Sequence, residues 1–467
     1  MPGMSAPGPA TVSLPTIDPS RLAPLIGPVR VSALLEAAEQ VRARLEGRRI
    51  VNVNSTATGG GVAELLQVLL GYARGAGIGT EWLVIRGSPD FFEITKRIHN
   101  WLHGVPGDGG ALGEEERRTY ERTTSANAEA ILNGVEPGDV VIVHDPQPAG
   151  LVPLLVDRGA LVVWRCHVGV DGRNEWTETA WAFLRRYVEP AHASVFSRAA
   201  FAPSFLAPER LAIIPPSIDP FATKNRSLPR SAAAAILGGA GLLDSSSTDG
   251  RVTRRAEILR SGGPVRAGEP VVTQISRWDG LKDMRGVLRG FVEHVPRTSR
   301  ARLILAGPSY AGVADDPEAE AVWNDAVADW ESLAEPDRSR VQLVLLPLAD
   351  AEENALVVNA LQRHAAVVVQ KSLAEGFGLT VTEAMWKSRA VVGGAVGGIV
   401  DQIVDGTSGV LVDPHDLDRF GTVVARLVDD PDERRRLGRN ARARVKTKFL
   451  PDRHLRDHAL LLARLLD

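Results

Sequence analysis

Cysteine is almost absent from this chain of 467 residues, which has a single thiol at Cys166. One thiol forms neither an internal disulfide nor a cysteine-based zinc site, so the sequence excludes both and predicts a reducing, cytoplasmic location. A large charge of either sign is also missing, since the formal net charge is −3. Bulk attraction to nucleic acid or to an anionic membrane is therefore excluded, whereas a local cationic pocket is not.

Long apolar runs are missing too, and none approaches the ~20 residues that span a bilayer. Residues 1–28 are rich in Pro, Ala and Gly but lack a basic segment followed by an unbroken apolar one, so they do not resemble a signal peptide. We expect them to form a flexible extension. Hydrophobic residues make up 44% and charged residues 24% of the chain, which excludes wholesale disorder and indicates two or three domains at this length.

Short apolar runs alternate with helical patterns along the chain, which is typical of an α/β fold. In the first half, strands are predicted at 50–54, 82–85, 139–143, 161–164, 195–196 and 212–214. In the second half, they are predicted at 271–275, 303–305, 341–346, 366–369, 390–392 and 409–412. Helices are predicted at 31–45, 62–72 and 451–466, from about 283 and from 379. The repetition indicates two Rossmann-like halves that face each other.

The proline-rich segment 215–220 separates the two series, because each proline stiffens the chain and restricts the residue before it. We predict an N-terminal domain over 29–218 and a C-terminal domain over 219–450. The Ala-, Gly- and Ser-rich tract 231–270 is expected to be mobile in parts. Open α/β sheets bind ligands where their strands end, so polar residues at those positions are the candidates for a functional site.

The most informative such position is the loop Glu375-Gly376-Phe377-Gly378, which follows the predicted strand 366–369. Gly376 and Gly378 permit a tight turn and let a ligand approach the backbone closely. Glu375 is placed at the carboxyl end of the strand, where its carboxylate can accept hydrogen bonds from sugar hydroxyls.

A helix is predicted to start at Leu379, with Thr380 or Thr382 as its cap. Free amides at a helix N-terminus bind phosphate, and Glu383 lies about one turn further along. Two carboxylates around an anion-binding turn fit a sugar nucleotide. The plainer alternative is a capped surface helix with acidic residues in its first turn, which the two glycines make less attractive.

Arg277 and Lys282 flank one turn after the predicted strand 271–275. Both cations can therefore point at a single diphosphate and neutralise the charge of a nucleoside diphosphate leaving group. The alternative is a solvated basic loop.

Three glycines, Gly59, Gly60 and Gly61, follow the first predicted strand. A dinucleotide-binding fingerprint requires G-x-G-x-x-G, and Glu64 stands where the third glycine belongs. An NAD-binding fold is therefore disfavoured. We still predict that this glycine-rich loop lies at the functional site.

Polar residues also end two other strands, at His144-Asp145 and at Cys166-His167. His167 is a candidate contact for a transferred sugar or an acceptor, and Asp145 for an acceptor hydroxyl. The alternatives are a core histidine and a turn-forming aspartate before proline. Cys166 is expected to be a small buried side chain. The segment 99–101 (His-Asn-Trp) is either a wall of the site or a helix face packed in the core.

These segments together resemble the retaining glycosyltransferases of GT-B fold, family 4. The pattern Glu375-x7-Glu383 with Arg277 and Lys282 carries the resemblance at that level. Within the family, the match is closer to the trehalose glycosyltransferring synthases and the related trehalose phosphorylases. The phrases that carry it are 53–56 with 59–64, 144–148, 164–167, 215–220 and 375–386.

The resemblance implies two Rossmann-like domains across a cleft, with a C-terminal helix at 451–467 that crosses back to the N-terminal domain. It implies a nucleoside diphosphate glucose as donor, bound mainly by the second half, and glucose as acceptor, bound mainly by the first. Trehalose would be the product of a reversible reaction, with no tightly bound cofactor and no catalytic metal. The family also makes a homodimer compatible with the sequence, whereas nucleic acid and membrane partners are not implied.

Roles follow by position from the same resemblance. The positions implied in catalysis are Asp145, His167, Arg277, Lys282 and Glu375. Those implied in donor binding are Gly60, Gly61, Arg277, Lys282, Gly376, Phe377, Gly378, Leu379, Thr380 and Glu383. The cation loop departs from the family pattern, with Gly280 where proline is expected and Asp283 where glycine is expected. Both cations are nevertheless present.

Other functions stay open on the sequence alone. The first is a trehalose phosphorylase, which would use the same cationic pocket for inorganic phosphate. The second is a family 4 transferase with another acceptor, and the third is a catalytically inactive nucleotide-sugar sensor. The base of the donor is not readable from any motif.

Overall fold

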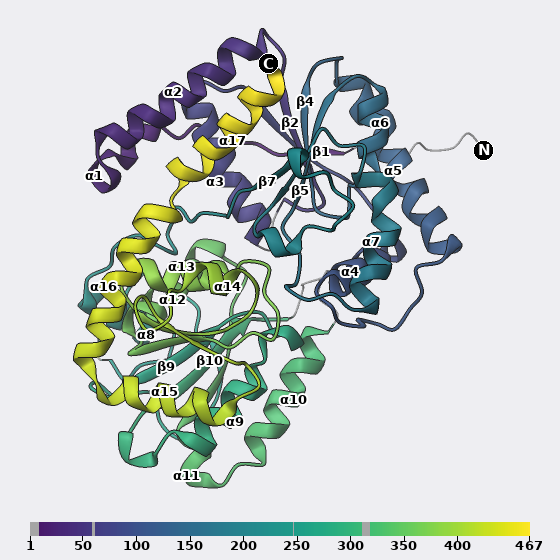
Figure 1. Ribbon diagram of the computed structural model, residues 1–467. Helices are drawn as coiled ribbons and strands as arrows, with labels where there is room; N and C mark the ends of the chain where they lie inside the picture. The colour runs from purple at the N-terminus through teal and green to yellow at the C-terminus, as the bar shows by residue number, and fades with distance from the viewer. Residues whose placement is uncertain (1–8, 58–60, 246, 311–317) are drawn as a thin grey trace. The chain divides into compact units, whose positions relative to one another are not determined.

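The computed structural model describes residues 9–57, 61–245, 247–310 and 318–467. The chain divides into two compact units. Unit 1 comprises Met1–Ser217 with Phe449–Asp467, and unit 2 comprises Ile218–Lys448 (Figure 1). The division falls inside the proline-rich segment 215–220. Within the described ranges, no helix has the length and apolar character needed to cross a membrane.

Unit 1 is built on a seven-stranded sheet in the order β1-β3-β2-β4-β5-β6-β7. All neighbouring pairs are parallel except β1 and β3, which are antiparallel. β2 and β4 are buried along their whole length, as expected for parallel strands covered on both faces. The strands are β1 (Ala10–Thr11), β2 (Ile50–Asn54), β3 (Thr80–Val84), β4 (Val140–His144), β5 (Leu161–Cys166), β6 (Ala193–Phe196) and β7 (Leu211–Ile213).

The helices of unit 1 cover both faces of this sheet. They are α1 (Ala23–Ile26), α2 (Pro28–Leu45), α3 (Gly61–Gly75), α4 (Pro89–Leu102), α5 (Glu114–Gly134), α6 (Leu151–Asp157), α7 (Glu175–Val188) and α17 (Pro451–Leu466). α17 returns from the end of the chain and packs along α2 and α3 (Figure 1). Arg30 on α2 forms a 2.6 Å ion pair with the buried Asp452 on α17, which fixes this helix in unit 1.

The N-terminal segment is packed into unit 1 from residue 9 onward, so the expectation of a flexible extension is wrong for residues 9–28. Leu22 is fully buried, and β1 adds a strand to the sheet edge. The backbone of Ile17 lies directly on α3 at Gly75, where any side chain would overlap its carbonyl oxygen. Ile17 thus packs directly on α3 at Gly71 and Gly75, a contact that the composition of the segment does not reveal. Residues 1–8 lie outside the described ranges.

Unit 2 contains a second seven-stranded sheet, in the order β14-β13-β12-β9-β10-β11-β8. Only β8 runs antiparallel to its neighbour, β11. The strands are β8 (Glu257–Leu259), β9 (Val271–Ile275), β10 (Arg302–Pro308), β11 (Val341–Leu346), β12 (Val367–Gln370), β13 (Ala390–Gly394) and β14 (Val410–Val412). The helices are α8 (Arg230–Gly239), α9 (Met284–His294), α10 (Ala319–Glu331), α11 (Glu335–Arg338), α12 (Ala351–His364), α13 (Leu379–Trp386), α14 (Gly397–Gln402), α15 (Leu417–Asp429) and α16 (Pro431–Lys448).

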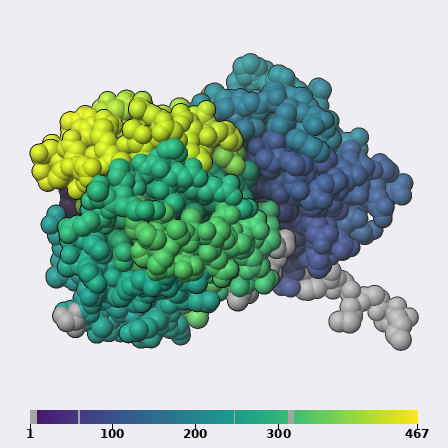
Figure 2. Space-filling view, turned by 90° about the horizontal axis from the view of Figure 1, so that it is seen from below, coloured from purple at the N-terminus to yellow at the C-terminus, as the bar shows by residue number. Residues whose placement is uncertain are grey.

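The tract 231–270 is more ordered than its composition led us to expect. It supplies most of α8, which packs on α12, and the edge strand β8. Ile236 and Leu237 are buried in the core between these helices and the sheet. In the space-filling view, teal and green segments of unit 2 form one continuous surface, so residues far apart in the sequence lie side by side (Figure 2).

Both sheets confirm the predicted α/β architecture of two Rossmann-like units. In each sheet the order of the strands reverses at one point, between β2 and β4 in unit 1 and between β9 and β12 in unit 2. Chain connections leave in opposite directions at such a point, which opens a crevice at the carboxyl ends of the strands. The loops that follow these four strands are therefore where a ligand is expected.

Candidate functional site

In unit 2, two predicted segments meet at the point where the strand order reverses. The loop 276–283 follows β9 and the loop 371–378 follows β12. The buried Gln274 of β9 joins them, because its Nε2 donates to the Lys282 carbonyl at 2.6 Å and its Oε1 accepts from the Lys371 backbone N–H at 2.9 Å. Gln274 thus holds the two loops next to each other.

Lys282 and Glu375, predicted independently, are in direct contact. Nζ of Lys282 lies 2.8 Å from Oε2 of Glu375, and the two side chains are only 17% and 12% exposed. Arg277 is more exposed, and its guanidinium lies 3.4 Å from the buried Asp279 carboxylate. Each cation of this loop therefore has a carboxylate beside it. An anionic ligand would compete with Glu375 for the Lys282 ammonium.

The loop Glu375-Gly376-Phe377-Gly378 is held in place by residues of α14. Gly398 donates its backbone N–H to the Glu375 carbonyl at 3.2 Å, and Gln402 donates its amide to the Phe377 carbonyl. A Cβ on Gly397 would overlap the carbonyl oxygen of Glu375. The backbones of the two loops are therefore in contact, and this fixes the position of Glu375.

The start of α13 corrects one prediction. Gly378 is the N-cap, in a left-handed conformation with φ of 85°, and no side chain caps the helix. Thr380 instead bonds Gln370 at 2.9 Å, and Thr382 bonds Gln402. Both threonines therefore bond side chains outside the helix instead of capping it. No side chain takes up the amides of the first turn, although the Val381 N–H donates to the Gly378 carbonyl at 3.0 Å.

Asp283 stands where the family pattern has glycine, and its backbone conformation shows why glycine would fit there. Its φ is 50°, in the left-handed region where glycine is favoured. Aspartate tolerates that region when its side chain is bonded locally, and here it caps α9 by accepting from the Gly286 N–H at 3.0 Å. Its carboxylate also pairs with the buried Lys371.

Glu383 is 3% exposed, which the sequence pattern did not predict. Its Oε1 lies 3.8 Å from Nζ of Lys224, which reaches it from a distant part of the sequence. One turn later, the buried Lys387 donates to Asn225 Oδ1 at 3.0 Å and to Gln362 Oε1 at 2.7 Å. Burial lowers the pKa of Lys387 to about 7. The surroundings of Glu383 are thus cationic and largely shielded from water.

In unit 1, the predicted residues Asp145 and His167 are adjacent. Asp145 adopts a left-handed φ of 67° directly after β4, and its Oδ1 accepts from the His167 backbone N–H at 2.7 Å. Burial raises the pKa of Asp145 to about 7, although that hydrogen bond and the Arg165 charge act in the opposite direction. The carboxyl group is therefore poised between its two protonation states near neutral pH.

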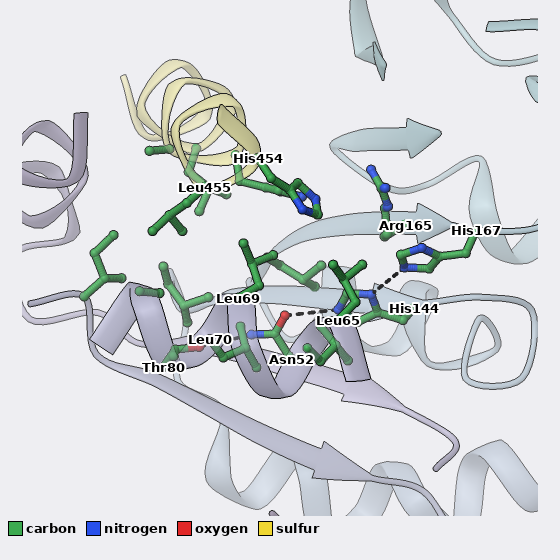
Figure 3. A pocket seen from close by; sticks show the side chains of 18 residues that line it. Asn52, Leu65, Leu69, Leu70, Thr80, His144, Arg165, His167, His454 and Leu455 are labelled. Atoms are coloured by element: carbon green, nitrogen blue, oxygen red, sulfur yellow. Dashed lines mark hydrogen bonds between the residues drawn. The ribbon is translucent and has the colours of Figure 1, made fainter. Parts of the chain in front are cut away.

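Four histidines line a cavity of about 50 Å³ between the sheet of unit 1, α3 and α17 (Figure 3). They are His144, His167, His454 and His458. Arg165 lines the same cavity and is 1% exposed, and burial lowers its pKa to about 9. Burial and the Arg165 charge lower the pKa of all four imidazoles, that of His144 to about 3. The cluster is consequently neutral apart from one guanidinium.

This cluster predicts that unit 1 loses stability in acid. An imidazole kept neutral by burial takes up its proton only on unfolding, so the unfolded state binds more protons below about pH 6.5. Each such proton lowers the free energy of unfolding by about 1.4 kcal/mol per pH unit until the folded pKa is reached, which is about 3 for His144. Asp145 acts in the opposite direction between pH 7 and 4, but four imidazoles outweigh it.

The thermal midpoint is therefore expected to fall steadily between pH 7 and pH 5, and His458→Leu is expected to make that slope shallower. Circular dichroism melts at constant ionic strength measure both. A midpoint independent of pH over this range would contradict the neutral cluster.

Other predicted residues are placed as follows. Trp101 packs against Trp176 at 5.2 Å between ring centroids and donates its indole N–H to the Pro106 carbonyl, so the segment 99–101 belongs to the core. Cys166 is fully buried, as expected. Gly61 begins α3, whereas Gly60 lies outside the described residues.

Several supporting residues were missed at the sequence level. They are Gln274, Lys371, Lys387 and Asn52, which act through contacts between distant segments. Only the Gly397-Gly398 pair after a predicted strand carried a usable signal. Among the described residues, no group of three or more potential ligands is arranged to hold a metal ion.

Comparison with known proteins gives matches to two family models. Residues 52–203 match the model of the trehalose synthase N-terminal domain, and residues 352–444 match the glycosyl transferases group 1. A trehalose synthase from Rubrobacter xylanophilus is 34% identical over 92% of this chain and 93% of its own length. A trehalose phosphorylase from Pleurotus sajor-caju is 26% identical over 83% of this chain, but that match spans 53% of the fungal protein.

The fold is shared with solved structures of low sequence identity. An α,α-trehalose-phosphate synthase (UDP-forming) from Burkholderia vietnamiensis superposes with a TM-score of 0.66 at 15% identity, covering 90% of this chain and 98% of that one. An Anabaena protein, HepE, in complex with UDP and glucose superposes with a TM-score of 0.62 at 15% identity, covering 89% of this chain and all of that one.

Proposed function

Because the chain belongs to the trehalose synthase family of glycosyltransferases with GT-B fold, we propose that it makes trehalose from a nucleoside diphosphate glucose and glucose, reversibly and with retention. The observation that carries the proposal is the ion pair between Lys282 and Glu375, which lies where unit 2 is expected to bind ligands. One loop supplies a cation for a diphosphate, and the other supplies a carboxylate for the sugar attached to it.

The donor is assigned to unit 2. Arg277, Lys282 and backbone amides at the start of α13 bind the diphosphate. Glu375 accepts hydrogen bonds from the donor glucose, and Glu383 accepts them from the ribose hydroxyls. Donor binding requires Lys282 to exchange part of its ion pair with Glu375 for phosphate oxygens. This exchange turns Glu375 toward the sugar in the same step.

The acceptor glucose is assigned to unit 1, at Asp145 and His167. Both side chains are half-buried at the carboxyl ends of neighbouring strands, where polar atoms converge. A carboxylate or imidazole at such a place orients a sugar hydroxyl by accepting its hydrogen bond. Gly61, which begins α3, is assigned to the same side of the site.

Transfer with retention proceeds by two inversions or by attack on the face that the leaving group occupies. Two inversions require a carboxylate on the opposite face of the anomeric carbon. We propose same-face attack. The bond from the anomeric carbon to the diphosphate oxygen breaks as the bond to the anomeric hydroxyl oxygen of the acceptor forms, and the acceptor proton passes to the leaving phosphate. Arg277 and Lys282 stabilise the developing negative charge.

A trehalose phosphorylase is the second candidate, since its inorganic phosphate would occupy the same cationic pocket. The comparisons favour the synthase, because the chain spans 93% of the bacterial synthase and about half of the fungal phosphorylase. A transferase with another acceptor is the third.

Product analysis tests the proposal. The purified protein is incubated with ADP-, UDP- or GDP-glucose and ¹³C-labelled glucose, and the product is identified by NMR. We expect trehalose with one labelled ring in at least one mixture, which also identifies the preferred base. Labelled glucose in a disaccharide other than trehalose, or no disaccharide despite measurable binding of the nucleotide sugar, would refute the trehalose assignment.

A further inference from the structure

A chain of four polar side chains crosses the sheet of unit 1 and ends at His167, one of the predicted acceptor residues (Figure 3). Asn52 donates through Nδ2 to Thr80 Oγ1 at 3.1 Å, and its Oδ1 lies 3.0 Å from His144 Nε2. The other nitrogen of His144, Nδ1, lies 3.3 Å from His167 Nε2. The four residues come from β3, β2, β4 and the end of β5, which are consecutive neighbours in the sheet.

The two imidazoles share one hydrogen bond in the plane of their rings. The ring planes are within 17° of each other, and the centroids lie 5.6 Å apart. That separation is the sum of the 3.3 Å nitrogen–nitrogen distance and the two ring radii, so the contact is edge to edge rather than face to face. One ring must then donate a proton and the other must accept it.

Asn52 decides which ring donates. Its carbonyl oxygen faces His144, so Nε2 of His144 must carry a proton and donate it. A neutral imidazole has only one N–H, so Nδ1 of His144 is the acceptor and Nε2 of His167 is the donor. Nδ1 of His167, its only remaining nitrogen, keeps a free lone pair.

From this geometry we infer that Asn52 is a positioning residue that sets the tautomer of the His144–His167 pair, so that His167 presents Nδ1 as a hydrogen-bond acceptor. The inference deepens the proposed function, since it rests on His167 facing the acceptor sugar. On this inference, Nδ1 of His167 accepts a hydrogen bond from a sugar hydroxyl.

The surroundings keep the pair neutral, so the tautomer rather than the charge is what Asn52 controls. Asn52 is 1% exposed and His144 is 4% exposed. The titratable groups that face the pair across the cavity are Arg165 on β5 and His454 and His458 on α17, and none of the described residues that line this cavity carries a carboxylate. A proton added to either ring would lie beside the Arg165 charge. The Asp145 carboxylate accepts its hydrogen bond from the His167 backbone N–H at 2.7 Å.

The test reads the tautomer directly. Protein labelled with ¹⁵N-histidine reports by NMR which nitrogen of each ring is protonated, and the His144→Gln and His167→Gln spectra assign the two rings. We expect His167 to be protonated at Nε2. In Asn52→Leu, His144 loses its acceptor, and both rings are expected to reverse, which turns His167 Nδ1 into a donor. Kinetically, Asn52→Leu is expected to lower kcat/KM for the acceptor about 10- to 100-fold with an unchanged donor KM.

Two further variants separate positioning from packing. Asn52→Asp keeps an acceptor toward His144 and should keep the tautomer, while its charge adds to the pH dependence of the acceptor KM that Asp145 already gives the wild type. Thr80→Val removes a partner of Asn52 but leaves His144 its acceptor, so it should preserve the tautomer. A wild-type spectrum with His167 protonated at Nδ1 would overturn the inference, as would an unchanged tautomer in Asn52→Leu. Because the spectra need no turnover, they test the inference even if the proposed reaction fails.

Discussion

Lys282→Ala is expected to lower kcat for transfer by about 10²–10³-fold, because a cation aimed at a leaving group contributes on that scale. Lys282 is placed for this role by the Gln274 bond to its carbonyl and by its ion pair with Glu375. Its removal also leaves the Glu375 carboxylate without its cation, so donor binding is expected to weaken. Steady-state kinetics with varied donor and a fixed saturating acceptor measure both effects.

The matched control is Arg289→Ala. Arg289 belongs to the same unit and pairs with Asp329 on the surface, away from the two loops. Its loss removes one positive charge without touching Gln274 or Glu375, so turnover should stay within twofold of the wild type. Lys282→Arg restores the charge with a bulkier group and is expected to recover part of the rate. Wild-type turnover in Lys282→Ala would remove Lys282 from the mechanism.

Gly397→Ala is expected to abolish or severely weaken donor binding, with at least a tenfold loss of affinity. The new Cβ would overlap the Glu375 carbonyl oxygen, and both atoms are attached to backbone. Relief of the clash requires the Gly397 backbone and the loop 375–378 to move apart, and this loop carries the predicted sugar and phosphate contacts. Titration calorimetry with the preferred nucleotide sugar measures the loss, and thermal melting reports the cost to stability.

Gly406→Ala separates this clash from backbone strain. Gly406 also has a left-handed φ, 66° against 48° at Gly397, but nothing lies within 4 Å of its Cβ position. Alanine costs roughly 1–2 kcal/mol in that region whatever its neighbours. The control should therefore lose some stability and retain donor affinity. Equal affinity losses in both variants would show that strain, and not the contact between the loops, determines binding.

The α/β fold was predictable because parallel strands buried on both faces read as short apolar runs. The run at 341–346 coincides with β11, and the strand predicted at 50–54 coincides with β2. The donor segments were also predictable, since strand, glycine turn and helix follow each other within a few residues. Glu375 and Lys282 were named separately, and the structure brings them together.

What could not be predicted depends on contacts between distant segments. Thr380 has the chemistry of a cap but bonds Gln370, and Gly378 is the N-cap at the start of the helix, in a left-handed conformation. Asn52 reads as an ordinary residue of a strand, and only the register of β2 with β4 brings it to His144. Ile17 lies in a proline-rich segment, and the surface that it packs on is formed by Gly71 and Gly75 of α3, more than 50 residues later in the sequence.

The most direct measurement of the central claim runs the reaction backwards. Trehalose is incubated with the purified protein and either the preferred nucleoside diphosphate or inorganic phosphate, and glucose release is followed in each. The account predicts release only with the nucleoside diphosphate, in step with formation of the nucleotide sugar. Release with phosphate alone, accompanied by glucose 1-phosphate, would contradict it and identify the chain as a phosphorylase.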